Sequence, residues 1–176
     1  NAIIRLLLAQ GARDIIGCGR DGALSGDATE GMHPSRKALA EATNPRHVHG
    51  SLKEVLKGAD VFIGVSSGNI LDPADIETMA DDAIVFALAN PTPEVDPIGA
   101  GKYAAVVATG RSDYPNQINN VLAFPGLFRG LLDAKVKEIT TEVLRVAAVA
   151  IASVISEDEL SPSYIIPGAF DKRVAP

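Results

Sequence analysis

Apolar residues in this chain gather in short continuous runs that alternate with stretches of helical periodicity. Four runs have the length and composition of buried strands: 14–18, 61–65, 83–88 and 104–108. Runs of this kind, without polar alternation, are typical of a parallel sheet that is covered on both faces. Helices between successive strands supply the crossovers that parallel pairing requires. The pattern predicts a doubly wound α/β domain of the Rossmann type with a mostly parallel sheet.

Capping signals place helices between these strands. Pro34 is typical of a first helical residue, and Ser51 and Glu54 have the spacing of a capping box. Asp72 and Pro73 are suited to the N-cap and the first turn of another helix. The sequence therefore predicts helices over 34–42, 52–57, 73–80, 125–132 and 138–155, followed by an extended, turn-rich tail over 156–176.

Residues 1–10 have the apolar spacing of a helix that begins without an N-cap residue or a preceding turn, and Gly11 is a typical residue for its end. The run at 14–18 would then complete the second half of a strand–helix–strand unit. We therefore expect the first strand of this unit to be missing from the chain.

Composition limits the class of partner. The chain has 176 residues, of which 47% are hydrophobic, and a net charge of -6 without any basic run. This balance argues against binding to nucleic acid or to a membrane surface. The single cysteine, Cys18, cannot form an internal disulfide, and no signal peptide or membrane-length apolar run is visible. We expect a cytoplasmic protein that binds small molecules.

Ligands of open α/β sheets bind beyond the carboxyl ends of the strands, and each predicted strand here ends in polar or glycine residues. Ser66 and Ser67 would approach a phosphate or ribose, or belong to an ordinary glycine-bearing turn. Asn90 is held rigid by Pro91, which favours a ligand contact over a bond to its own backbone.

The fourth strand is followed by an amide-rich loop, residues 108–126, with no secondary-structure pattern of its own. Loops of this length are uncommon in compact domains unless they are functional or disordered, and the apolar run near Phe124 argues against disorder. Amides can orient a carboxylate or carboxamide without adding charge. Arg111 and Ser112 accompany four of them: Asn116, Gln117, Asn119 and Asn120.

The first strand ends where a dinucleotide-binding domain usually carries an acid for the ribose 2′-hydroxyl. Gly19 leaves room there and Arg20 supplies a guanidinium, which favours a 2′-phosphate and hence NADP. Asp21 could still bind the ribose, and Arg20 could equally be an exposed residue of a surface turn. His47 and His49 have a spacing that could hold a metal, but the segment offers no further ligand, so we predict no metal site.

Four segments closely resemble bacterial malic enzymes, and the resemblance covers nearly the whole chain: GADVFIGVS at 58–66, FALANPTPE at 86–94, ATGRSDYPNQINNVLAFPGLFRG at 108–130 and YIIPGAFDKRVAP at 164–176. The resemblance implies oxidative decarboxylation of L-malate to pyruvate and CO2 with NAD or NADP and with Mg2+ or Mn2+. It implies contacts of Asn90 and Asn120 with both malate and the nicotinamide end of the cofactor, with Asn119 beside them at the substrate. It places Ser66 and Ser67 along the cofactor cleft, and Gly19 where the family often has the ribose-binding aspartate.

The same resemblance implies that residues 1–176 form one N-terminally truncated dinucleotide-binding domain, which lacks its first strand and its glycine-rich loop. It places the general acid tyrosine, the general base lysine and the metal-binding carboxylates upstream of this chain. We therefore expect no catalytic residue and no metal ligand within it, no activity of the chain alone, and a homo-oligomer formed by the full-length enzyme. Two alternatives stay open. One is an amino-acid or methylene-tetrahydrofolate dehydrogenase domain, against which the Asn119–Asn120 pair speaks; the other is a non-catalytic dinucleotide-sensing module, which would need no substrate amides.

Overall fold

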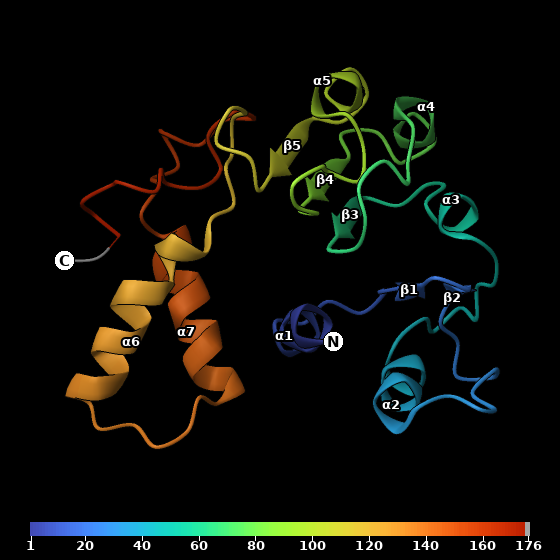
Figure 1. Ribbon diagram of the computed structural model, residues 1–176, viewed down its shortest axis with the longest axis horizontal. Coiled ribbons are helices and arrows are strands. Elements are labelled where there is room, and N and C mark those ends of the chain that lie inside the picture. Colours follow the sequence, from blue (N-terminus) through green and yellow to red (C-terminus); the bar gives the residue numbers. More distant parts are fainter. Residues whose placement is uncertain (175–176) are drawn as a thin grey trace. The chain divides into compact units, whose positions relative to one another are not determined.

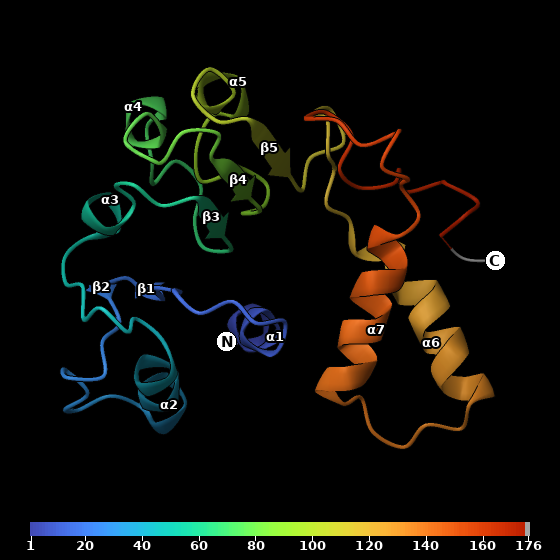
Figure 2. The same cartoon turned by 180° about the vertical axis from the view of Figure 1, so that it is seen from behind.

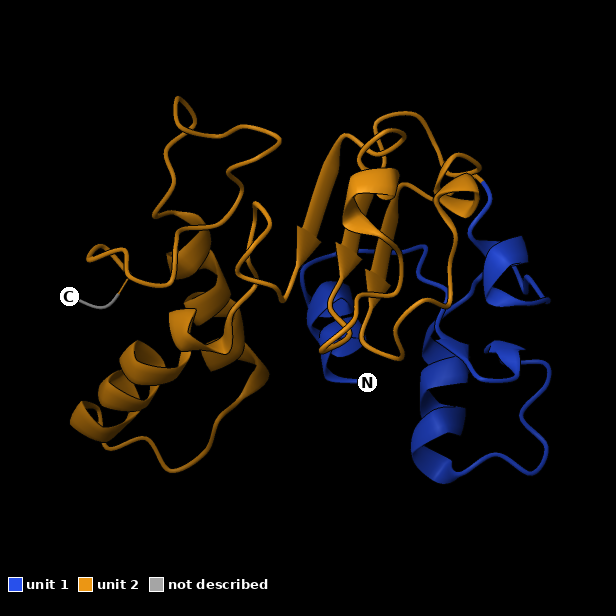
Figure 3. Cartoon of the chain, turned by 45° about the horizontal axis from the view of Figure 1, so that its top comes forward, with its two compact units in different colours: residues 1–57 blue, residues 58–176 orange. Residues whose placement is uncertain are grey.

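The computed structural model describes residues 1–174. The chain divides into two compact units, Asn1–Lys57 and Gly58–Pro176 (Figure 3). The first unit contains a two-stranded sheet and the second a three-stranded sheet. Within residues 1–174, no helix is long and apolar enough to cross a membrane.

The sheet of the second unit is parallel and contains β3 (Val61–Gly64), β4 (Ile84–Ala87) and β5 (Val106–Thr109). Its strand order is β3-β4-β5, and the three strands lie side by side in both views (Figures 1 and 2). Val85, on the central strand, is fully buried. The predicted α/β class with a parallel sheet is confirmed, with strands one or two residues shorter than the apolar runs.

Two short helices follow β3 and β4, namely α4 (Pro73–Ile76) and α5 (Pro97–Ala100). The prediction that the first continues to residue 80 is wrong. The carbonyl of Thr78 accepts from the Gly58 N–H at 2.8 Å, and the Ala80 N–H donates to Ala59 at 3.1 Å. These bonds to a distant loop draw the backbone out of the helix after Ile76.

Helix α5 was not expected, although its start has the same Asp-Pro signal as α4. The Asp96 side chain accepts from the Gly99 N–H at 2.7 Å, and Pro97 occupies the first turn. Capping of this kind satisfies a backbone N–H that the first helical turn would otherwise leave without a partner. Four residues are too few to show the apolar periodicity on which the sequence reading depended.

The C-terminal part of the second unit contains a 3-10 turn, η1 (Asn120–Leu122), and helices α6 (Phe124–Asp133) and α7 (Thr141–Ala152). The helix predicted over 125–132 is confirmed. The helix predicted over 138–155 is shorter at both ends. It begins at Thr141, because Thr140 caps it by accepting from the Val143 N–H at 3.3 Å, and it ends at Ala152. An apolar cavity of about 490 Å³ is lined by residues of both helices.

The first unit contains α1 (Ala2–Ala9), β1 (Cys18–Gly19), β2 (Gly22–Ala23), α2 (Pro34–Ala42) and α3 (Leu52–Val55). Helix α2 has the predicted bounds, and the Ser51–Glu54 capping box is present, although α3 ends two residues early.

The buried strand predicted over 14–18 is wrong. β1 and β2 form a tight antiparallel hairpin, in which Gly22 has a φ of 104° that favours glycine. The carbonyl of Ile15 instead accepts from the Asn44 N–H at 2.7 Å. Cys18, expected at the end of a buried strand, is exposed.

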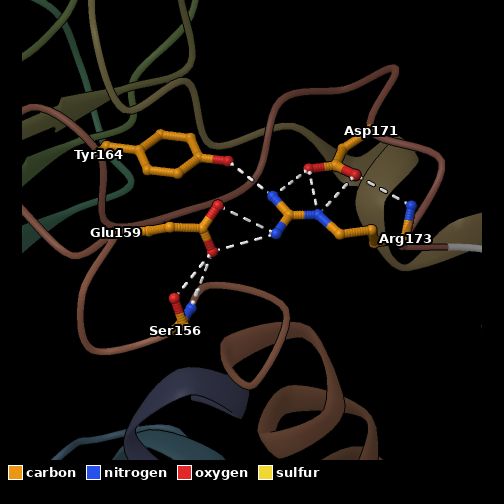
Figure 4. A network of polar contacts seen from close by, with 5 residues as sticks. All are labelled: Ser156, Glu159, Tyr164, Asp171 and Arg173. Atoms are coloured by element: carbon orange, nitrogen blue, oxygen red, sulfur yellow. Dashed lines mark hydrogen bonds and ion pairs between the residues drawn. The ribbon is translucent and has the colours of Figure 1, made fainter.

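Arg173 holds the C-terminal tail together (Figure 4). Its guanidinium donates to Asp171 at 2.8 Å, to Glu159 at 3.0 Å and to the Tyr164 hydroxyl at 3.1 Å. Glu159 also accepts from the Ser156 N–H at 3.1 Å. The predicted turn-like tail is confirmed up to residue 174, since it contains only turns and one bridge; residues 175–176 lie outside the described residues.

Acid should loosen this tail. The Ser156 N–H, and after it Arg173, lowers the pKa of Glu159, and Arg173 lowers the pKa of Asp171. A carboxyl with a lowered folded-state pKa contributes stability above its ordinary pKa and loses it as the pH falls. Hydrogen exchange of residues 156–174 should therefore accelerate, relative to β3–β5, below about pH 4. Arg173→Gln should already show this acceleration at pH 7. Equal protection of the tail at both pH values would contradict the prediction.

The central strand should be sensitive to loss of volume. Val85→Ala removes two methyl groups from a fully buried position. Deletion of buried methyl groups leaves a cavity, so we expect a loss of roughly 2 kcal/mol in the free energy of unfolding. Val61→Ala, at a position 47% exposed on β3, is the matched control and should cost much less. Chemical denaturation measures both, and equal losses would place the core elsewhere.

Candidate functional site

Polar residues of the second unit follow each parallel strand at its carboxyl end. Ser66 and Ser67 come after β3, Asn90 after β4, and Asn119 and Asn120 after β5. All are exposed except Asn119, which is half-buried. Since β4 is the central strand, the Asn90 loop lies between the other two loops. The fold therefore brings five of the predicted site residues to one edge of one sheet.

Backbone contacts join the loop after β3 to the loop after β4. The Asn69 N–H donates to the carbonyl of Pro93 at 2.9 Å, and the Leu71 N–H donates to Glu94 at 3.0 Å. Gly68 packs against the second loop so closely that an added Cβ would lie 2.6 Å from the carbonyl oxygen of Thr92. Glycine is needed at this position because the two backbones approach each other.

Glu94 reinforces this junction from inside the protein. Its side chain is fully buried and accepts from the Ser66 N–H at 2.8 Å and from the Ala89 N–H at 2.9 Å. A Cβ at residue 64 would lie 2.6 Å from Glu94 Oε1, so Gly64 makes room for the carboxylate. The carboxylate thus fixes the backbone directly before Ser67 and Asn90. Sequence reasoning missed this role; the available signal was an acid in a proline-rich turn opposite a strand-ending glycine.

Asn90 is presented to solvent by this rigid loop. Its peptide bond to Pro91 is cis. Its side chain makes no hydrogen bond to any of residues 1–174. The amide therefore does not bond its own backbone, which was the alternative role considered for it. The amide retains both its donors and its acceptor for a ligand.

The amides of the loop after β5 have separate roles. Asn116 is buried, and its amide donates to Val107 at 3.1 Å and Pro162 at 2.8 Å and accepts from the Ile165 N–H at 2.9 Å. It therefore fastens the tail to β5. Gln117 forms an isolated backbone bridge with Thr109. The loop was expected to lack secondary structure, and η1 corrects that expectation.

Asn119 and Asn120 differ in how many of their amide atoms remain available for further contacts. The Asn119 Oδ1 accepts from the Val121 N–H at 3.0 Å and thereby caps η1, which leaves its Nδ2 group for other contacts. Asn120 is exposed, and its side chain has no hydrogen-bond partner among residues 1–174. Arg111 pairs with Asp113 at 2.8 Å and lies 5.3 Å from the Tyr114 ring centroid. The amide of Asn120 therefore keeps its donors and its acceptor for other contacts.

Gly19 and Arg20 belong to the β1–β2 hairpin of the first unit. Both residues are exposed. A Cβ at residue 19 would lie 2.6 Å from Nη2 of Arg36, an α2 residue that sequence reasoning had not considered. Asp21 pairs with the same nitrogen at 3.3 Å. Arg20 therefore belongs to the hairpin itself, and the guanidinium of Arg36 lies beside it at Gly19.

His47 and His49 share the carboxylate of Asp27, which the local sequence did not reveal; Asp27 Oδ1 lies 3.7 Å from His47 Nδ1. His49 Nε2 lies 3.1 Å from Asp27 Oδ2, and His47 Nδ1 lies 3.2 Å from the Ser25 hydroxyl. The Ser25 hydrogen bond, and after it His49, lowers the pKa of Asp27. In the part of the chain that the structure describes, no group of three or more His, Cys, Asp or Glu side chains is arranged to hold a metal ion.

Loss of the Glu94 carboxylate should weaken the junction of the two loops. Glu94→Gln keeps the shape but turns an NH2 group toward one of two buried N–H donors, which costs about 1 to 3 kcal/mol in the free energy of unfolding. Glu77→Gln, at an exposed position after α4, is the control and should change stability by less than about 0.5 kcal/mol. Denaturation curves compare the two. If both variants match the parent protein, the carboxylate has no such role.

Known proteins resemble this chain over nearly its whole length. The family model described as "Malic enzyme, NAD binding domain" matches residues 6–173. The NAD-dependent malic enzyme of Geobacillus stearothermophilus is 55% identical over 173 residues, which are 98% of this chain and 36% of that protein. An NADP-dependent malic enzyme of Rhizobium meliloti is 39% identical, over 98% of this chain and 25% of that protein.

A solved structure of an NAD-dependent malic enzyme from Thermotoga maritima superposes with a TM-score of 0.89 at 43% identity, covering 98% of this chain and 45% of that one. The chain thus spans less than half the length of these relatives. Because the family model covers nearly all of the residues, the chain belongs to the malic enzyme family.

Proposed function

We propose that this chain is the dinucleotide-binding domain of an NAD- or NADP-dependent malic enzyme, which converts L-malate to pyruvate and CO2 by oxidative decarboxylation. The observation that carries the proposal is the pair of exposed amides, Asn90 and Asn120, at one carboxyl edge of the parallel sheet. The similar proteins include both NAD- and NADP-dependent malic enzymes, which supports the proposal.

The amides suit a site that binds both a dicarboxylate and a nicotinamide. Each Nδ2 group donates to a carboxylate oxygen, and each Oδ1 accepts from a carboxamide, without altering the charge of the site. Asn90 and Asn120 would contact malate and the nicotinamide end of the cofactor. Asn119 retains its Nδ2 group and would bind the substrate beside them.

Ser66 and Ser67 would line the cofactor cleft. Both are exposed directly after β3, where open α/β sheets bind ligands. Their hydroxyl groups fit ribose and phosphate oxygens, and Glu94 holds the Ser66 backbone in place. The bound dinucleotide supplies the hydride acceptor. Gly19 and Arg20 would lie at the adenosine end of the cofactor.

The remaining chemistry belongs, in this proposal, to the longer polypeptide. A divalent Mg2+ or Mn2+ would polarise the hydroxyl and keto oxygens of the substrate. The metal ligands and the acid–base residues would lie outside residues 1–176, so the chain alone would not turn over malate. We further propose a cytoplasmic homo-oligomer that binds neither nucleic acid nor membranes, in keeping with the net charge of -6.

Removal of either free amide should impair turnover by the full-length protein. Asn90→Ala and Asn120→Ala should each lower kcat/KM for L-malate by about tenfold to a hundredfold, since hydrogen bonds to charged groups are worth about 1.5 to 3 kcal/mol. The assay is steady-state oxidation with Mn2+, run in parallel with NAD and NADP, with pyruvate as the measured product.

Asp81→Ala, in the exposed turn before β4 at the opposite edge of the sheet, is the control and should leave turnover unchanged. If malate turnover by the parent protein is robust and Asn120→Ala does not affect it, the assigned role of the amide is wrong. If the parent protein binds a dinucleotide but turns over no malate, the chain belongs to a binding-only module.

A further inference from the structure

One side chain anchors the amide-rich loop after β5 in the interior. Asn116 is 6% exposed, and within the described loop 110–120 no other residue is buried. Its φ is 55°, in the left-handed region that asparagine adopts more readily than most residues. The two substrate amides, Asn119 and Asn120, follow within four positions. The loop is therefore held inside the protein at one residue, directly before these amides.

The Asn116 amide joins two segments that are distant in sequence. Its Nδ2 group donates to the carbonyl of Val107 on β5 at 3.1 Å and to that of Pro162 in the tail at 2.8 Å. Its Oδ1 accepts from the Ile165 N–H at 2.9 Å. The tail partners lie 46 and 49 positions further along the chain, where the tail returns to the loop (Figures 1 and 2). These three hydrogen bonds form a clasp between β5 and the tail.

The tail segment that the clasp engages is ordered by its own backbone bonds. The Tyr164 N–H donates to the carbonyl of Ser161 at 3.0 Å, and the Ser161 N–H donates to that of Tyr164 at 3.3 Å. The clasp binds the backbone groups of Pro162 and Ile165, which lie within and directly after this pairing. Asn116 therefore contacts a formed turn, whose shape does not depend on the ligand.

The chain is less firmly held after the two substrate amides than before them. Leu122 in η1 is buried, but α6 and α7, all of whose residues are described, contain no buried side chain. Before the amides, the Ile118 N–H donates to the carbonyl of Thr109 at 2.8 Å, which extends the attachment to β5. The place of the two amides is therefore set from the side of Asn116.

We infer that Asn116 is a positioning residue for the oxidation of malate, and that it acts by holding Asn120 at a fixed place relative to Asn90 through the clasp. A group that orients a substrate loses about a hundredfold in rate when it is misplaced by about 1 Å. The tail thereby influences turnover without contributing a group to the substrate. The inference rests on the proposed function, because Asn120 is taken to contact malate and the nicotinamide.

Asn116→Gly tests the clasp in the full-length protein, since glycine keeps the left-handed backbone and removes all three hydrogen bonds. At saturating dinucleotide, kcat for L-malate should fall by about tenfold or more. The Kd of the dinucleotide should change by less than about threefold, because Asn120 meets only its nicotinamide end. In an Asn120→Ala background the same substitution should cost less than about threefold, since no amide is left to position. Equal losses of kcat in both backgrounds would overturn the inference.

Asn44 provides the matched control. It is buried with a φ of 53°, and its amide donates to the carbonyls of Leu24 at 2.9 Å and Val48 at 2.8 Å and accepts from the Val48 N–H at 2.8 Å. It belongs to the first unit and to no proposed site. Asn44→Gly should lower the midpoint of chemical denaturation about as much as Asn116→Gly and leave kcat unchanged at saturating dinucleotide. An equal fall of kcat in the two variants would reflect general destabilisation, and Asn116 would have no positioning role.

Hydrogen exchange of the full-length parent protein tests the coupling without a variant and without turnover. Coupling is reciprocal, so a ligand that binds the loop held by the clasp also stabilises the clasp. Saturating NAD or NADP should therefore slow exchange of the Ile165 N–H together with that of the Ile118 N–H, by comparable factors. Protection of Ile118 alone would show that the tail is not coupled to the amides, and the inference would be wrong.

The two proposals fail in different ways. If the parent protein oxidises malate and Asn116→Gly leaves kcat unchanged, the proposed function stands and the assignment of Asn116 is wrong. If the parent protein oxidises no malate but the dinucleotide protects both Ile118 and Ile165, the coupling of the clasp to the dinucleotide site stands and the proposed function is wrong.

Discussion

The buried carboxylate of Glu94 is the contact on which the candidate site depends. It satisfies two backbone N–H groups, at Ser66 and Ala89, that the ends of β3 and β4 would otherwise leave without partners. Buried polar groups of this kind are costly unless they are paired. By pairing them, one side chain joins two loops, fixes the entry to Asn90, and requires glycine at residue 64. The exposed residues can therefore stay free for ligands while their backbone is held.

Local chemistry explains which parts of the fold could be predicted from the sequence. Continuous apolar runs identified β3, β4 and β5, and Pro34 and the Ser51–Glu54 pair identified the starts of two helices, because these signals act over a few residues. The end of α4 could not be predicted, since it is set by backbone hydrogen bonds that join Thr78 and Ala80 to the distant segment 58–59. The hairpin of β1 was missed because an apolar run does not reveal whether a partner strand lies beside it.

The same distinction applies to the candidate site. Sequence reasoning placed Asn90 and Asn120 at strand ends, where the structure leaves both amides free. It could not separate them from Asn116, whose amide is consumed by bonds to Val107, Pro162 and Ile165, because two of those partners lie more than forty positions along the chain. Glu94 and Arg36 were missed for a related reason: Ser66 lies 28 positions from Glu94 and Asp21 lies 15 positions from Arg36, and neither residue type is unusual in its local setting.

The distribution of charge can be compared within each of the two units separately. At the strand ends of the second unit, the buried carboxylate of Glu94 binds backbone N–H groups, and the amides of Asn90 and Asn120 stay exposed and neutral. At the β1 hairpin the arrangement is inverted, since a cation is exposed, its aspartate partner is held at 3.3 Å, and the backbone beneath it has no side chain. A glycine at that position matters less for its flexibility than for the carboxylate it excludes.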